Sequence, residues 1–147
     1  MCDRRADVRT LVVSDLHLGA RLQRGVLHHP EPLAALLRAL DGVERLVLLG
    51  DVVELLEGRG PQAMEIAEPV LRALGARIGN STEVILVPGN HDHALVAPWL
   101  QARGAHVEPA PLGLEEHPGI HASAGTEAIA QWLAPATLSV AYPGVWL

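Results

Sequence analysis

Three short polar motifs, each directly after an apolar stretch, hold the residues of this chain that are best suited to chemistry. They are Asp15-Leu16-His17, Gly50-Asp51-Val52-Val53-Glu54 and Gly89-Asn90-His91-Asp92. Their carboxylates, imidazoles and amide are groups that Mn²⁺, Fe²⁺ or Zn²⁺ accept as ligands. Because successive side chains of an extended segment alternate, Asp15 and His17 point to one side and can share one ion.

The second and third motifs can extend this arrangement to two ions. Asp51 follows a strand on a turn where Gly50 permits close backbone approach, and its two carboxylate oxygens can bridge two metals. Asn90 offers a neutral carbonyl oxygen to the second ion. Two metals about 4 Å apart clamp an in-line displacement at phosphorus and generate hydroxide at neutral pH. The residues therefore predict a metal-dependent attack on a phosphoester.

His91 and Asp92 follow the expected metal ligand Asn90 and are candidates for proton transfer. As an imidazolium, His91 could stabilise a phosphoryl oxygen or protonate the leaving alkoxide. Asp92 could hold that ring in one tautomer. Glu54 leaves two interpretations open, because a carboxylate there suits either the first turn of a helix or a contact behind the metal ligands.

Apolar runs and helical periodicity predict an α/β fold with a largely parallel sheet. Strands are expected over Val8 to Ser14, Arg45 to Leu49 and Glu83 to Val87. Leucines spaced as on one helix face, from Leu33 to Leu40, predict a helix between the first two strands. A second helix is expected from about Pro61 to Arg77, kinked or split by its internal Pro69. All three motifs then fall at the carboxyl edge of the sheet, where such folds bind ligands.

The second half of the chain has weaker signals and no sign of a second domain. A helix is expected to open at Asp92, disturbed by Pro98. The remaining expectations are a short strand at His106 to Glu108, a loop from Pro109 to Gly119, a helix from Thr126 to Leu133 and a strand from Thr137 to Tyr142.

The three motifs together resemble the calcineurin-like metallophosphoesterase superfamily, whose pattern is D-x-H, then G-D-x-x-[DE], then G-N-H-[DE], then a histidine and last G-H-x-H. The resemblance spans Val8 to about Arg103 and implies an α-β-β-α sandwich with two divalent ions. It implies Asp15, His17 and Asp51 at the first metal and Asp51 with Asn90 at the second. It also implies His91 as the catalytic histidine and Asp92 as its partner. Ser14-Asp15-Leu16-His17-Leu18-Gly19 is similar to the bacterial branch of the lipid A pathway pyrophosphatase and the SbcD-type nucleases.

The later histidine and the G-H-x-H motif of that pattern are absent from this chain. After His93, which adjoins the third motif, only His106, His117 and His121 follow, and whether one of these three substitutes for a missing ligand stays open. We therefore expect residues 1–147 to be the N-terminal part of a single catalytic domain, without its C-terminal strands. The second metal site would be incomplete, and an exposed sheet edge would favour self-association.

The amino-acid composition makes some classes of function less favoured than others. The net charge is −6 and every basic residue is Arg, without a basic tract, so nucleic acid is an unfavoured partner. Cys2 is the single cysteine and no apolar run reaches the length of a membrane span, so we expect a cytoplasmic protein. Besides a phosphoester hydrolase, a non-catalytic metal-binding or interaction module and a DNA nuclease of the same superfamily remain as alternatives.

Overall fold

A four-stranded parallel sheet forms the centre of the molecule in a computed structural model, which describes residues 8–21, 25–57, 59–106, 108 and 110–147. The strands are β1 (Thr10–Val13), β2 (Arg45–Leu49), β3 (Glu83–Val87) and β5 (Thr137–Val140). They lie in the order β1-β2-β3-β5, each parallel to its neighbour. The expected α/β class is confirmed, and β2 and β3 have the bounds that the sequence predicts.

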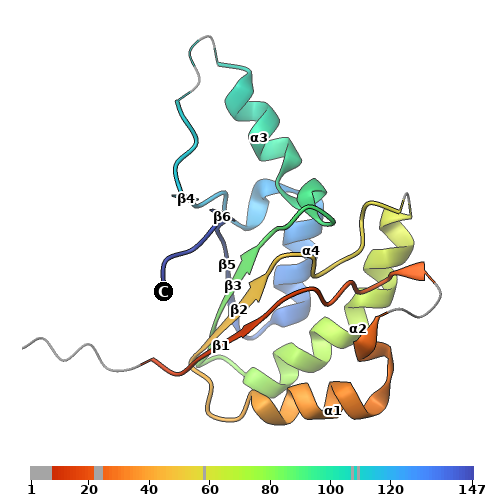
Figure 1. The fold of residues 1–147 in the computed structure, drawn as a ribbon. Helices are drawn as coiled ribbons and strands as arrows, with labels where there is room; N and C mark the ends of the chain where they lie inside the picture. The colour runs from red at the N-terminus through yellow and green to blue at the C-terminus, as the bar shows by residue number, and fades with distance from the viewer. Residues whose placement is uncertain (1–7, 22–24, 58, 107, 109) are drawn as a thin grey trace, which may run out of the picture.

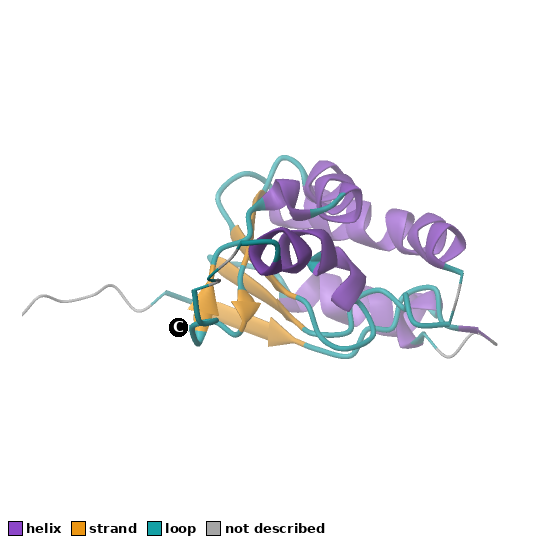
Figure 2. Cartoon of the chain, turned by 90° about the horizontal axis from the view of Figure 1, so that it is seen from above, coloured by secondary structure: helices purple, strands orange, loops and turns teal. Residues whose placement is uncertain are grey.

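Three helices cover one face of this sheet, as the view from above shows (Figure 2). They are α1 (Pro30–Ala39), α2 (Gly60–Ile78) and α4 (Ala124–Leu133). Leu46 and Leu48 from β2 meet Leu71 and Leu74 of α2 in a buried core that also takes Ile129 of α4. This alternation of buried and opposite-facing side chains fixes the register of the strands.

The helix α2 is continuous through Pro69, so the expected split is wrong. Proline removes the N–H that would bond the carbonyl of Glu65. Both residues are exposed, so water can satisfy that carbonyl. The buried face of α2, including Ala67 and Val70, packs as one unbroken stripe and outweighs the lost hydrogen bond.

The segment after the third motif differs from the expected single helix. It forms a short 3-10 turn, η3 (His93–Leu95), and then α3 (Ala97–Gly104). Pro98 lies in the first turn of α3, where its missing N–H is not needed. The strand expected at His106 to Glu108 includes Val107, which lies outside the described residues, and neither flanking residue is in a strand.

The end of the chain forms two short strands where the sequence predicted one. Only β5 joins the parallel sheet, while β6 (Tyr142–Pro143) pairs antiparallel with β4 (Glu115–Glu116) inside the expected loop. Two further 3-10 turns are η2 (Val26–His28) and η4 (Ile120–Ala122). In the described part of the chain, no helix is long and apolar enough to cross a membrane.

Candidate metal centre

The loops that follow β1, β2 and β3 run side by side at one edge of the sheet (Figure 1). The Asp15 N–H donates to the Gly50 carbonyl at 3.1 Å, and the His17 N–H donates to the Asp51 carbonyl at 2.8 Å. The Gly50 N–H donates in turn to the Val87 carbonyl at 2.7 Å. Parallel pairing thus continues past the strands and brings the three motifs together.

Asp15, His17 and Asp51 form one group of candidate metal ligands. One ligand atom from each lies within 4.8 Å of the others, and His17 Nε2 is 3.7 Å from Asp15 Oδ1. Two carboxylates and an imidazole at this spacing form a donor set that suits an intermediate divalent ion. The three residues predicted for the first metal therefore converge.

The backbone of the same three residues is strained. Asp15, His17 and Asp51 have φ values of +57°, +43° and +55°, and they are the non-glycine residues with positive φ in the described part of the chain. Such conformations cost on the order of 1–3 kcal/mol each and gather at functional sites. The strain coincides with the donor set, so the residues present fit a divalent ion.

Gly89 allows the loop after β3 to approach Asp51 closely. A Cβ at this position would lie 2.4 Å from Asp51 Oδ1, a distance that no real side chain tolerates. The neighbouring His91 N–H donates to the same Oδ1 at 2.8 Å. The glycine of the third motif is thus required by packing against the carboxylate of the second.

Glu54 joins the two histidines of the site. Its Oε2 lies 3.0 Å from Nδ1 of His17 and 2.7 Å from Nδ1 of His91, and the residue is only 3% exposed. Its Oε1 accepts from the Leu56 N–H at 3.2 Å. The sequence left this role open, although the apolar neighbours Val53 and Leu55 indicated burial, and a buried carboxylate needs partners.

The contacts of Glu54 and His91 shift the pKa values of both groups. Burial raises the pKa of Glu54, but the hydrogen bonds with His91 and His17 outweigh it and leave that pKa below its ordinary value. The hydrogen bond with Glu54 raises the pKa of His91, against the opposing effect of desolvation. The contact between Glu54 and His91 therefore stabilises the charged form of each side chain.

Asp92 does not orient the His91 ring, so this part of the expectation is wrong. Its Oδ1 accepts from the N–H groups of Gly89 (2.7 Å) and Asp51 (3.3 Å). Its Oδ2 accepts from those of Val52 (2.7 Å) and Val53 (3.4 Å). Buried backbone donors need acceptors, and the fully buried Asp92 supplies them. Burial raises its pKa even though these four bonds favour the carboxylate.

The other predicted residues lie as follows. Asn90 is exposed on the turn after β3, between Gly89 and His91, and so lies at the edge where the second ion was expected. His117 and His121 instead contact Glu115 at 3.4 Å and Glu127 at 2.7 Å. Among the described residues, the groups of candidate metal ligands do not include His106, His117 or His121.

A family model with the description calcineurin-like phosphoesterase matches residues 8–136, which include every residue of the candidate metal centre. The chain belongs to the calcineurin-like phosphoesterase family. The resemblance of the three motifs is thereby confirmed. The description of the family names its members as phosphoesterases.

One solved structure with similarity to this calcineurin-like phosphoesterase chain is the nuclease MPE of Pseudomonas putida. The two are 30% identical, with a TM-score of 0.42. The match covers 58% of this chain and 40% of the nuclease, so this chain spans less than half of that protein. A search of the curated proteins found no match.

Proposed function

We propose that this chain carries the metal centre of a two-metal phosphoester hydrolase. The observation that supports this most is the convergence of Asp15, His17 and Asp51 on strained backbone at the carboxyl edge of the sheet. An ordinary cluster of carboxylates on a protein surface has no need of a strained backbone. Its coincidence with three potential ligands favours a site built to hold an ion in a fixed geometry.

The residues divide between two ions in this proposal. Asp15, His17 and Asp51 would hold the first, and Asp51 with Asn90 would hold the second, whose shell within this chain is incomplete. Mn²⁺, Fe²⁺ or Zn²⁺ suits these mixed oxygen and nitrogen donors. When bound, such ions polarise the phosphoryl oxygens and lower the pKa of a water that attacks phosphorus.

His91 would assist the leaving group. Its Nδ1 is engaged by Glu54, which leaves Nε2 for the substrate. As an imidazolium it gives the Nε2 proton to the leaving alkoxide, and the adjacent Glu54 carboxylate stabilises the positive charge before that transfer. Asp92 would act through the backbone, because its hydrogen bonds hold the turn that carries Asp51.

The charge of the chain bears on its substrate and location. With a net charge of −6, a small phosphoester is favoured over a long nucleic acid, for which the chain lacks a basic tract. We also propose a cytoplasmic location, since a single cysteine cannot form an intrachain disulfide.

The variant Asp51→Asn tests the proposal, with Asp41→Asn, an exposed carboxylate away from the site, as the control. Hydrolysis of an aryl phosphate monoester and diester with Mn²⁺ should fall at least about 100-fold in the first variant only, because it loses the bridging carboxylate. Undiminished turnover in Asp51→Asn would sink the proposal.

Calorimetric titration of the same proteins with Mn²⁺ tests the ligand assignment separately. We expect one tight ion in the wild-type chain and loss of that ion in Asp51→Asn. Two tight ions would contradict the incomplete second site. Tight Mn²⁺ binding by a wild-type chain that turns over neither ester would favour a non-catalytic metal-binding module instead.

A further inference from the structure

A basic pocket adjoins the metal centre, and we propose that it binds a second phosphate group of the substrate, one that does not react. The inference rests on the proposed hydrolase function and narrows its substrate to a compound with two phosphate groups joined by a short linker. The pocket is separate from the candidate metal ligands, none of which lines it.

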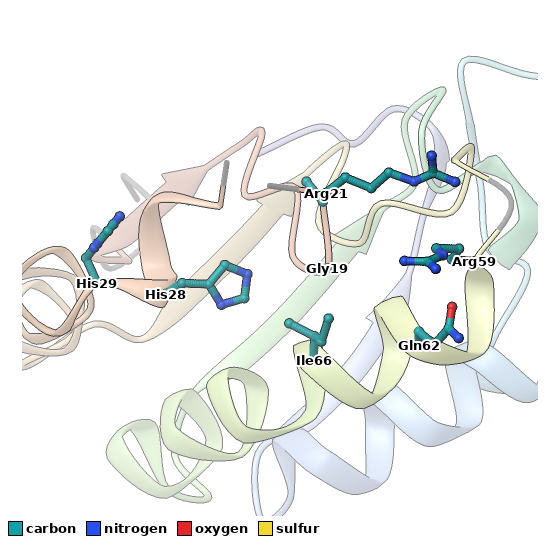
Figure 3. Close-up of a pocket in the computed structure, with 8 residues that line it drawn as sticks. Gly19, Arg21, His28, His29, Arg59, Gln62 and Ile66 are labelled. Carbon is teal, nitrogen blue, oxygen red and sulfur yellow. The ribbon is translucent and has the colours of Figure 1, made fainter. Parts of the chain in front are cut away.

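Three segments form the walls of this pocket. The loop after β1 contributes Gly19 to Arg21, the turn before α1 contributes His28 and His29, and α2 with its N-cap contributes Arg59, Gln62 and Ile66. Figure 3 shows Arg59, Gln62 and His28 directed toward one space from opposite sides, with Arg21 along its rim. The cavity volume of about 460 Å³ lies in the range of small-molecule sites.

The pocket continues directly from the first motif. Gly19 lies two residues after His17, so their Cα atoms are at most about 7 Å apart. The Ala20 N–H donates to the His17 carbonyl at 3.1 Å, which turns the chain from the metal ligand into the pocket wall. The pocket wall therefore begins in the same short loop that carries the metal-ligand candidate His17.

Close packing holds this wall in place. Gly19 has a φ of +86°, and a Cβ on it would lie 2.4 Å from the Cα of Ala63 in α2. The loop after β1 therefore lies directly against α2. This contact holds two segments that are distant in the sequence, the loop that carries Arg21 and the helix that follows Arg59, together in the wall of one cavity.

The charge of the lining residues selects an anion. The lining contains two arginines and no carboxylate, in a chain whose net charge is −6. Arg21 is held by Glu57, since its backbone N–H donates to Glu57 Oε2 at 3.0 Å and its Nη2 donates to the Glu57 carbonyl at 3.2 Å.

Arg59 differs from Arg21 in its partners. In the parts of the chain that the structure describes, the arginine ion pairs involve Arg21, Arg45, Arg72, Arg77 and Arg103, and do not include Arg59. A guanidinium group presents a planar fork of donors that matches a phosphate. Arg59 is therefore the arginine of the pocket that we expect to bind the phosphate, while Arg21 lies at the rim with its guanidinium group engaged by Glu57.

Titration with inorganic phosphate in the presence of a metal chelator tests the pocket without the metal centre. The wild-type chain should bind phosphate, and Arg59→Ala should bind it about tenfold more weakly, because one charged hydrogen-bonding partner is lost. The matched control is Arg38→Ala, which removes an exposed arginine of α1 outside the pocket and should bind like the wild type. No phosphate binding, or equal binding by Arg59→Ala, would overturn the proposal.

Steady-state kinetics with Mn²⁺ then shows whether the pocket binds a phosphate group of the substrate or only free phosphate. Glycerol monophosphate and glycerol bisphosphate differ by one phosphate group. We expect Arg59→Ala to raise KM about tenfold for the bisphosphate and to leave kcat and the monophosphate KM unchanged. An equal KM for both esters in the wild type would assign the pocket to free phosphate and refute its role in substrate recognition.

These measurements distinguish a failure of the pocket proposal from a failure of the proposed hydrolase function. If the wild type hydrolyses neither the aryl esters nor the glycerol esters, the hydrolase proposal fails and the assignment of a substrate phosphate fails with it. If it hydrolyses the aryl esters only, the assignment of a substrate phosphate fails alone. The chelated titration still decides whether the pocket binds phosphate, because that measurement depends on neither metal nor turnover.

Discussion

One carboxylate oxygen, Oε2 of Glu54, contacts both imidazoles of the metal centre. Each histidine uses Nδ1 for this contact, and the two rings are nearly perpendicular with centroids 4.7 Å apart. Nδ1 bonded to a carboxylate leaves Nε2 of His17 for a metal and Nε2 of His91 for a substrate. At the scale of single residues, the position of both Nε2 atoms therefore depends on Glu54.

Replacing Glu54 by Gln should reduce Mn²⁺ affinity and phosphoester turnover by about 10- to 100-fold, because the amide no longer fixes the tautomer or charge of either ring. Calorimetry and steady-state kinetics measure the two effects. The control is Glu68→Gln, which removes an exposed carboxylate that pairs with Arg72 on α2. A Glu54→Gln variant with wild-type affinity and kcat would contradict this role.

At the scale of elements, the helical layer depends on a close approach of α2 to α4. Gly75 in α2 lies against the backbone of Leu133, where an added Cβ would be 2.7 Å from the Leu133 carbonyl oxygen. Small residues allow helices to pack at such short separation, and interiors tolerate little extra volume. Gly75 is thus required by contact and not by its own backbone conformation.

The variant Gly75→Ala should lower the free energy of unfolding by about 1–3 kcal/mol, because overpacking forces the two helices apart. Urea unfolding followed by circular dichroism measures this change. Gly104→Ala is the matched control, since the same methyl group at the end of α3 meets nothing within 4 Å. A loss of stability that is equal in both variants would show that α2 and α4 are not packed in this way.

At the scale of the whole molecule, the sheet in the described residues has two edge strands, β1 and β5, and one partly open face. In the described part of the chain, β1 pairs only with β2. Val12 and Leu49 lie on the face away from the helices and are 44% and 43% exposed. Unpaired backbone and apolar side chains in one place favour contact with another sheet.

We propose that two copies of this chain associate through the β1 edge. Sedimentation velocity should show a concentration-dependent dimer for the wild type and a monomer for Val12→Lys, because a charge beside the edge opposes strand pairing. Leu112→Lys is the control, since Leu112 has a similar exposure of 45% but lies outside the sheet. A wild-type chain that stays monomeric at high concentration would refute this association.

The sequence alone determined the three motifs, the strands that precede them and the α/β class. These features follow from local periodicity and from the rule that parallel strands end at one edge. Asp15, His17 and Asp51 converge as that rule predicts. The sequence therefore predicted this group of candidate metal ligands, because each of the three residues follows a strand whose direction the pattern indicates.

Only the tertiary structure showed which carboxylate accepts hydrogen bonds from which groups. Asp92 is adjacent to His91 in sequence, yet it accepts from four backbone N–H groups, while Glu54 from another loop reaches both rings. The pocket formed by Arg21 and Arg59 likewise joins segments that no local pattern connects. Periodicity specifies the face and order of elements, whereas side-chain partners depend on the packing of loops that are distant in sequence.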